Sequence, residues 1–295
     1  EIASCLVGSE MCIRDSTATV GARVRQDDML AVWPSAYPAD TVLDFFTYAG
    51  APGAYSLNLG SGAGVWWSND GFSISANYVS ANGNIGDPNN GGIATDGAAS
   101  NGTVQVAYAP DNWGIAAAYN YASQNGGTLY SGNGTPLAVM ATSEGNNSSV
   151  GISAWWTPEE SGWIPSISTG YGFNSITNDD STVFRSVDTQ SWYVGLQWAD
   201  AFLKGNTLGM AVGQPTFVTG VDYRDDDDDS NFVADGNYAW EWWYMFQVTD
   251  NISVTPAIYY LSRPYGDLTD GTFGGDDSDS TFSNFGGLIK TTFKF

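Results

Sequence analysis

The sequence contains no histidine, and its only two cysteines, Cys5 and Cys12, lie within the first 16 residues. These absences exclude a Ser-His pair and a His-based metal site, and they leave no thiol nucleophile outside that first segment. The glycine-rich stretch Gly60–Gly64 lacks the following lysine of a phosphate-binding loop. We therefore expect no catalytic residue, no metal site and no cofactor, and the chain is not expected to be an enzyme.

Basic residues are also scarce, with nine Lys and Arg against 32 Asp and Glu and a formal net charge of -23. Nucleic-acid binding requires a basic surface, so this class of partner is excluded. The sequence has no run of about 18 apolar residues, which excludes a transmembrane helix. If the chain resides in a membrane, it must cross with strands closed into a barrel.

Aromatic residues and glycine are abundant, while charge is low. Aromatic residues make up 14 % of the chain, charged residues another 14 %, and there are 36 glycines. A soluble acidic protein of this size would carry more Lys and Glu and fewer Trp. This composition favours a protein whose outer surface meets lipid.

Residues 1–16 differ in composition from the rest of the chain and do not form a signal peptide, because no basic segment precedes an apolar one. Cys5–Ser16 resembles translated sequencing-adaptor sequence, so we expect 1–16 to be a non-native leader. The alternative is a genuine N-terminal segment. Residues 17–295 then form the remaining domain.

From Thr17 onward, apolar residues recur at every second position in segments of about ten residues, the pattern of membrane-spanning strands. The fold class expected is all-β, a transmembrane antiparallel β-barrel. About 12 strands are present, at 17–25, 62–68, 72–81, 102–109, 112–122, 148–157, 163–174, 189–198, 206–217, 237–248, 251–262 and 284–295.

One parity of these segments is apolar and aromatic, and we expect it to face lipid. The other parity holds Gly, Ser, Thr, Asn, Gln and almost all charged strand residues, and we expect it to face a water-filled lumen. The predicted pore-lining residues are Arg23, Arg25, Asp27, Asp28, Glu241, Arg263, Lys290 and Lys294.

Short turns alternate with long loops along the chain, the plan of a porin. The last strand ends on Phe293 and Phe295, which we expect to be an assembly signal for the barrel-assembly machinery. Its C-terminal end would lie on the short-turn, periplasmic side, with all long loops outside.

The long loops carry runs of acidic residues. These are Asp225, Asp226, Asp227, Asp228 and Asp229, and in the last loop Asp276 and Asp277. They are either a solvated surface or an acidic extracellular mouth that attracts cations or binds Ca²⁺ weakly. An EF-hand is not supported, because its mid-loop Gly and terminal Glu are missing.

Loop 26–61 is unusually apolar for a surface loop, and so many apolar groups would not remain in water. We expect it to fold into the barrel and narrow it. Packing across the outer rim or against a neighbouring subunit is the alternative.

Three stretches, Gly195–Asn206 with Gly213-Gln214-Pro215, Asp250–Ile258 and Thr291–Phe295, resemble cyanobacterial outer-membrane porins. These are similar to the carbohydrate-selective (OprB-like) porin family, and some are called iron-uptake porins. The resemblance implies a sixteen-stranded barrel, a homo-oligomer such as a trimer, and an N-terminal wall-binding domain joined by a coiled coil. We therefore expect that domain and about four strands to be missing before Thr17.

The function expected is passive diffusion of small hydrophilic solutes across the outer membrane, including inorganic ions such as iron, and carbohydrates. The alternative is a secreted, acidic β-rich structural or adhesive protein with Ca²⁺-binding loops. In that case the aromatic parity would face a dry interior.

Overall fold

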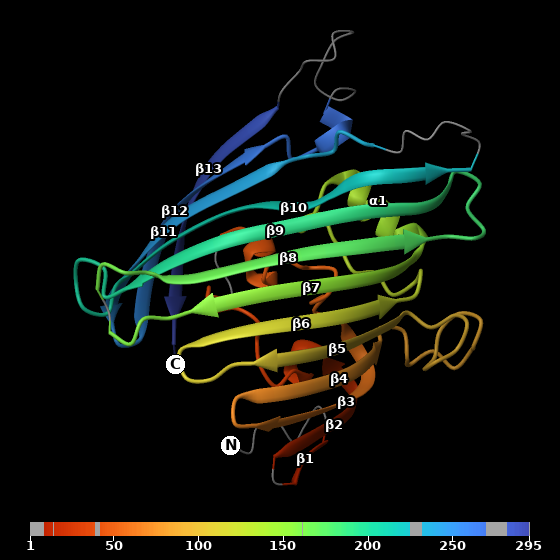
Figure 1. Ribbon diagram of the computed structural model, residues 1–295, viewed down its shortest axis with the longest axis horizontal. Coiled ribbons are helices and arrows are strands. Elements are labelled where there is room, and N and C mark those ends of the chain that lie inside the picture. The colour runs from red at the N-terminus through yellow and green to blue at the C-terminus, as the bar shows by residue number, and fades with distance from the viewer. Residues whose placement is uncertain are drawn as a thin grey trace.

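The computed structural model describes residues 9–13, 15–38, 42–160, 162–224, 232–269 and 282–294. The described residues form one antiparallel sheet in which the strands follow one another in sequence order (Figure 1). The strands are β1 Ser9–Ile13, β2 Ser16–Arg25, β3 Leu59–Asn69, β4 Phe72–Ser80, β5 Ser100–Tyr108, β6 Trp113–Ala122, β7 Asn146–Trp156, β8 Ser166–Thr177, β9 Phe184–Ala199, β10 Thr207–Tyr223, β11 Tyr238–Thr249, β12 Ile252–Ser262 and β13 Ser283–Phe293.

All twelve predicted strands are confirmed as β2 to β13, and β1 adds a short strand from the leading segment, paired with β2. Strands β9 and β10 are longer than predicted, so the loops on either side are shorter. The continuation of β10 beyond Pro215 is difficult to predict from the sequence, because proline has no backbone N–H to donate to the ladder of a sheet. Irregularities between Gln214 and Phe217 and between Val218 and Gly220 let the pairing resume.

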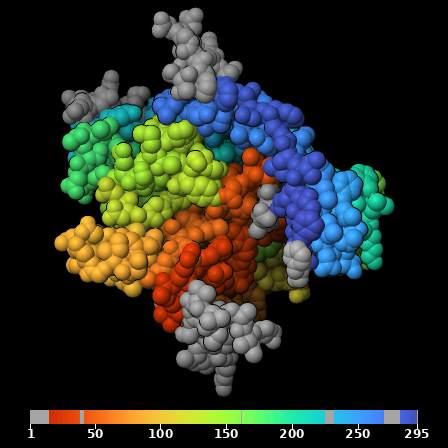
Figure 2. Space-filling model, turned by 180° about the vertical axis from the view of Figure 1, so that it is seen from behind, coloured from red at the N-terminus to blue at the C-terminus, as the bar shows by residue number. Residues whose placement is uncertain are grey.

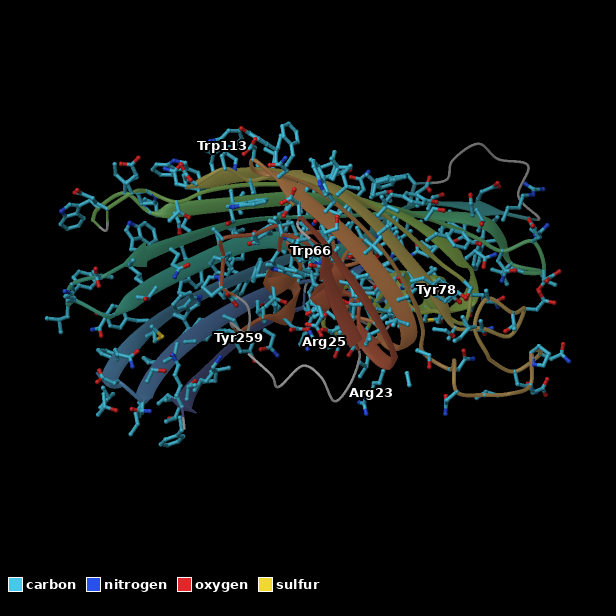
Figure 3. All side chains as sticks on the ribbon, turned by 90° about the horizontal axis from the view of Figure 1, so that it is seen from below. Arg23, Arg25, Trp66, Tyr78, Trp113 and Tyr259 are labelled. Carbon is cyan, nitrogen blue, oxygen red and sulfur yellow. The ribbon has the colours of Figure 1, made fainter. Side chains whose placement is uncertain are left out.

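The sheet is strongly curved and open (Figure 3). Strands β1 and β13 form its two margins, and in the described residues β13 pairs with β12 alone.

The two faces of the sheet reverse the pattern of a soluble protein. On β4, Ile74 is 50 % exposed on the convex face, whereas Ser73 and Ser75 on the concave face are each 1 % exposed. The same alternation runs through the neighbouring strands, with large apolar residues outside and Ser, Thr, Asn and Gln inside. This confirms the parity assigned to these strands.

Short turns gather at one end of the sheet and long loops at the other (Figure 1). The end of the chain lies at the short-turn end: the Lys294 N–H donates to the Asn251 carbonyl at 2.9 Å, and the Asn251 side-chain amide donates to the Lys294 carbonyl at 2.8 Å. The predicted position beside the short turns is thus confirmed, and the periplasmic side stays a prediction.

The largest buried apolar cluster lies on the concave face, where residues 26–58 fold against the wall. This segment, called the inner loop below, contains the short 3₁₀ helices η2 Asp27–Met29 and η3 Asp44–Tyr48. Its base is closed by the Gln26 N–H, which donates to the Asn58 carbonyl at 3.1 Å. A third 3₁₀ helix, η4 Gly266–Leu268, follows β12.

Helix α1, Pro136–Glu144, was not predicted. Its signals are present in the sequence, because the Thr135 side chain caps it and Pro136 begins it. It packs with Ile176, Phe184 and Val218 in a second apolar cluster at the long-loop end. No helix in the described part of the chain is long and apolar enough to cross a membrane.

Candidate functional site: the inner loop and the lumen wall

The inner loop lies on the concave wall, as one of the two alternatives predicted. The hydroxyls of Ser35 and Tyr193 share a hydrogen bond of 2.7 Å, and the Ala36 N–H donates to the Ser168 hydroxyl at 3.0 Å. Because Tyr193 and Ser168 belong to β9 and β8, these bonds fasten the loop to the middle of the sheet. Placement on the outer rim is excluded for this structure.

Glycines on the wall make room for the loop backbone. A Cβ atom at Gly170 would lie 1.8 Å from the Ala49 carbonyl oxygen, and one at Gly172 would lie 2.9 Å from the Ala51 Cα. At Gly195 the same position is taken by the Tyr37 ring, 2.6 Å away. These glycines form a track in which the loop sits closer to the wall than any side chain would allow.

Glu241 on β11 holds the other part of the loop. Its fully buried carboxylate accepts the Tyr37 hydroxyl at 2.7 Å, the Leu43 N–H at 2.7 Å and the Val42 N–H at 3.2 Å. The Trp243 indole N–H donates to the Tyr37 oxygen at 2.8 Å. Burial, and secondarily the charge of Glu241, raise the pKa of the Tyr37 hydroxyl, so it remains a donor.

This geometry corrects the role predicted for Glu241. The residue lies on the lumen face, as expected, but the loop covers it. Its charge therefore satisfies loop donors instead of facing open water. Sequence spacing could not show this, because Tyr37 and Glu241 are 204 positions apart.

A buried amide network seats the start of the loop. The Gln26 side-chain amide donates to Asn101 Oδ1 at 2.6 Å and to the Thr103 hydroxyl at 3.1 Å. The Ser56 hydroxyl donates to Gln26 Oε1 at 3.1 Å, and the Asn101 amide donates to the Ser56 oxygen at 3.0 Å. The two ends of the loop are thus tied to each other and to β5, a role that sequence reasoning missed.

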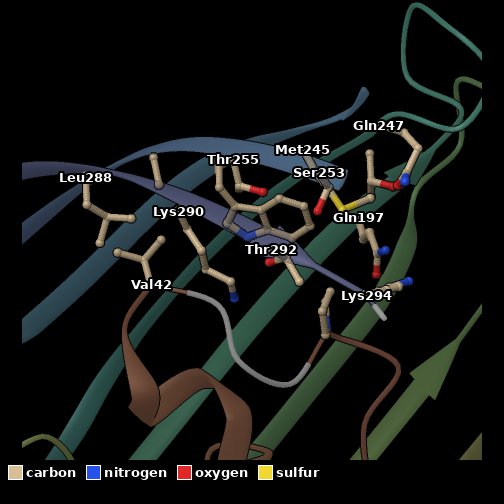
Figure 4. A pocket seen from close by; sticks show the side chains of 14 residues that line it. Val42, Gln197, Met245, Gln247, Ser253, Thr255, Leu288, Lys290, Thr292 and Lys294 are labelled. Carbon is tan, nitrogen blue, oxygen red and sulfur yellow. The ribbon is translucent and has the colours of Figure 1, made fainter. Parts of the chain in front are cut away.

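A cavity of about 290 Å³ separates the loop from the last strands (Figure 4). It is bounded on the loop side by Val42 and on the wall by Trp243. Lys290 and Lys294 line it together, as the lumen parity of β13 predicts, and no acidic side chain is among its described lining residues. Polar neighbours complete the wall, among them Gln197, Gln247, Ser253, Thr255 and Thr292.

Arg25 does not follow the predicted parity. A register shift between Gly21 and Val24 places Val24 opposite Gly60 and Arg25 opposite Leu59. Val24, expected outside, is buried on the concave face with Met29. A β-bulge reverses the faces of all later residues in the strand. The Arg25 guanidinium pairs with the Asp27 carboxylate at 2.7 Å.

The other predicted pore residues are spread out. Arg23 and Asp28 are exposed, Arg23 at the margin of the sheet (Figure 3). Arg263 follows β12 at the long-loop end, where its guanidinium donates to the Ala234 carbonyl at 3.0 Å and the Gly266 carbonyl at 3.2 Å. It therefore ties loops at the rim and does not line the cavity. Of the predicted set, the structure brings Arg25 and Asp27 together as an ion pair, and Lys290 and Lys294 together on the cavity wall.

Several predicted residues lie outside the described residues. They are the acidic set Asp225, Asp226, Asp227, Asp228, Asp229, Asp276 and Asp277, together with Phe295. Phe293 is described and is exposed on the convex face.

At the long-loop end, buried Asp235 joins three loops. It accepts the Thr135 hydroxyl, the Val218 N–H at 2.8 Å and the Asp267 N–H at 2.8 Å. Burial raises the pKa of the Asp235 carboxyl, since desolvation disfavours its charged form. Three hydrogen bonds partly oppose that shift.

Two known proteins are similar to this chain in sequence. It is 28 % identical to the uncharacterized protein alr4550 of Nostoc sp. over 262 residues, covering 83 % of this chain and 40 % of the relative. It is also 28 % identical to the uncharacterized protein sll0772 of Synechocystis sp., covering 80 % of this chain and 43 % of that protein. The chain thus spans less than half the length of these relatives.

Solved structures share the fold. The outer-membrane protein OmpT of Vibrio cholerae has a TM-score of 0.55 at 11 % identity, with 97 % of this chain and 80 % of that one covered. OprB of Pseudomonas putida has a TM-score of 0.52 at 15 % identity, with 97 % and 71 % covered. The model of the carbohydrate-selective porin, OprB family, matches residues 21–295. The chain belongs to the carbohydrate-selective porin, OprB family.

Proposed function

We propose that this chain forms the wall of an outer-membrane porin, through which small hydrophilic solutes diffuse, and that the inner loop sets the width of the passage. The observation that carries the proposal is the docking of the loop on a polar concave wall whose opposite face is apolar and exposed. A polar interior with a fixed constriction selects solutes by size and charge.

The apolar convex face supports a location in lipid. Its large side chains would be costly to expose to water over so wide an area. Between β1 and β13 the antiparallel strands pair their backbone polar groups with one another, as the membrane requires, whereas the outer edges of β1 and β13 have no such pairing among the described strands. We further propose assembly by the barrel-assembly machinery, with Phe293 and Phe295 as the signal, and a homo-oligomeric state such as a trimer.

The solutes proposed are inorganic ions, including iron, and carbohydrates. Family membership supports carbohydrates, while the acidic loop sequences support attraction of cations at the mouth. Inside, Lys290 and Lys294 give the cavity wall the opposite sign. Reversal potentials in a KCl gradient would measure which sign controls permeation, and anion selectivity would overturn the cation proposal.

The alternative, a secreted structural or adhesive protein, requires the aromatic parity to face a dry interior. That parity is instead exposed on the convex face, as at Phe72, Ile152 and Phe285. This observation favours the channel over the alternative. Solubility of the refolded protein without detergent would reverse the preference.

The test is the single-channel conductance of the protein in planar bilayers. Deletion of residues 33–46 removes Tyr37 and most of η3, so the passage should widen and conductance should rise. A matched deletion of residues 84–96 in the loop between β4 and β5 should leave conductance unchanged, because that loop lies outside the lumen wall at the long-loop end (Figure 1). Unchanged conductance after deletion of 33–46 would refute the constriction.

A further inference from the structure

The turns after β7 and β9 come together at the short-turn end of the sheet (Figure 1). Residues of these two turns line a groove on the convex face. It has a volume of about 540 Å³ and is lined by Trp163, Trp198, Asp200, Phe202 and Leu208, with Gly162 and Ala201. It is separate from the lumen, because Trp198 and Leu208 belong to the outward parity of their strands. Most of it comes from residues 198–202 of the Gly195–Asn206 stretch, to which the pore assigns no role.

The turn between β9 and β10 is built to hold Phe202 outward. Phe202 adopts a left-handed backbone with φ of 62° and is 81 % exposed. A bulky residue rarely adopts this conformation without support from its surroundings. Here the Gly205 N–H donates to Asp200 Oδ1 at 2.7 Å, and the Tyr244 hydroxyl donates to the Ala201 carbonyl at 2.7 Å.

The opposite side of the groove is also fixed. The Trp198 indole N–H donates to the Trp163 carbonyl at 3.0 Å, which ties the turn after β7 to β9. The Trp163 side chain is 92 % exposed. The exposed rings of Phe202 and Trp163 are therefore positioned by hydrogen bonds between neighbouring groups, and neither ring takes part in these bonds.

The lining combines aromatic rings and one carboxylate with no lysine or arginine among its described residues. Aromatic faces suit the apolar faces of a sugar ring, and a carboxylate accepts hydroxyl hydrogen bonds. A phospholipid would bring a phosphate charge beside Asp200, which like-charge repulsion disfavours. An uncharged, hydroxyl-bearing group is the chemistry that fits.

The groove continues into the apolar convex face. Leu208 lies directly opposite Trp198 on one side and Tyr244 on the other, so these three outward residues form a row across the strands. An acyl chain could lie along this row while its headgroup stays at the strand ends. This position is where the membrane interface meets a barrel.

We propose that this groove binds a glycolipid of the surrounding leaflet, with its sugar headgroup between Trp163 and Phe202, a headgroup hydroxyl bonded to Asp200, and its acyl chains along the convex face. The proposal rests on the proposed function, because it requires the convex face to lie in lipid.

The test is native mass spectrometry of the protein in detergent with three diacylglycerol lipids of identical acyl chains, carrying galactose, phosphoethanolamine or phosphoglycerol. The galactolipid should be retained preferentially. Trp163→Ala should weaken its retention about three- to tenfold, the range of one aromatic contact. Trp113→Ala, at another exposed convex tryptophan at the short-turn end, is the matched control and should change nothing (Figure 3).

A second variant addresses the carboxylate. Asp200→Asn retains an oxygen for the Gly205 N–H but loses the charge, so binding of the phosphoglycerol lipid should rise. Equal retention of all three lipids, or a preference for the phosphoethanolamine lipid, would overturn the proposal. Bilayer conductance of the same preparation distinguishes the two failures: a protein that conducts without galactolipid preference refutes the groove alone.

Discussion

The Tyr37 hydroxyl donates to the buried Glu241 carboxylate at 2.7 Å, and this bond joins the inner loop to strand β11. Two loop N–H groups share the same carboxylate. The buried charge is thereby satisfied by three donors, which is the condition for keeping a carboxylate out of water. The constriction proposed for the pore depends on this contact and on the glycine track beneath the loop.

Removal of the Glu241 carboxylate should release the loop. Glu241→Ala leaves the Tyr37 hydroxyl and two N–H groups without their acceptor, at a cost of about 1–3 kcal/mol. Single-channel recordings should show higher and noisier conductance. Lys204→Ala, at an exposed site in the turn between β9 and β10, serves as the control and should match the wild type. Identical traces for both variants would show that Glu241 does not hold the loop.

A methyl group in the glycine track should have a similar effect by a different route. The Cβ of Gly170→Ala would overlap the Ala49 carbonyl, so the loop must shift, at about 1–3 kcal/mol for such overpacking. Gly102→Ala is the matched control, because the Asn77 carbonyl oxygen would lie 3.5 Å from its Cβ, an ordinary van der Waals contact. Gly170→Ala should raise conductance and Gly102→Ala should not. Equal conductance of the two would contradict the close seating of the loop.

Charge in the cavity should affect ion selectivity. Lys290→Gln and Lys294→Gln each remove one positive charge from the wall. At roughly 8 Å in water, the loss of a unit positive charge changes the energy of a permeating ion by about 0.5 kcal/mol, with opposite signs for cation and anion. The permeability ratio should therefore change about sixfold in favour of cations. Reversal potentials in a KCl gradient measure this ratio. Lys204→Gln, on an outer turn, is the control, and a null shift for both cavity variants would remove them from the ion path.

The buried Asp235 carboxyl, which accepts hydrogen bonds from three segments at the long-loop end, should make the free energy of unfolding depend on pH. The folded-state pKa of this carboxyl is raised by burial, so the folded protein binds a proton more readily than the unfolded chain. The free energy of unfolding should therefore rise as pH falls from neutral through the raised pKa. Asp235→Asn removes this titration, and the difference between the two proteins in thermal melts at each pH isolates it. A constant difference across pH would contradict the prediction.

The strands and their faces were predictable because each is decided locally. Alternation of side chains along a strand assigned Ile74 outside and Ser75 inside from the sequence alone. The same rule placed Lys290, Lys294 and Thr292 on one cavity wall. The alternation rule failed at Arg25, because a β-bulge before this residue reversed the two faces of β2. No residue type in the sequence indicates this bulge.

The candidate site was only half predictable. The apolar composition of residues 26–61 indicated that the loop avoids water, yet it did not distinguish the lumen from the outer rim. Placement in the lumen depends on glycines of β8 and β9, such as Gly170 and Gly195, which meet the loop only when the sheet curves around it.

The sequence by itself determined an antiparallel sheet with one apolar and one polar face and a chain end beside the short turns, since strand periodicity and loop length are properties of neighbouring residues. Only the tertiary structure decided that the Glu241 carboxylate accepts hydrogen bonds from the loop instead of facing water. The partners of a buried carboxylate come from distant parts of the chain, and only the folded backbone brings Tyr37 and Leu43 to it.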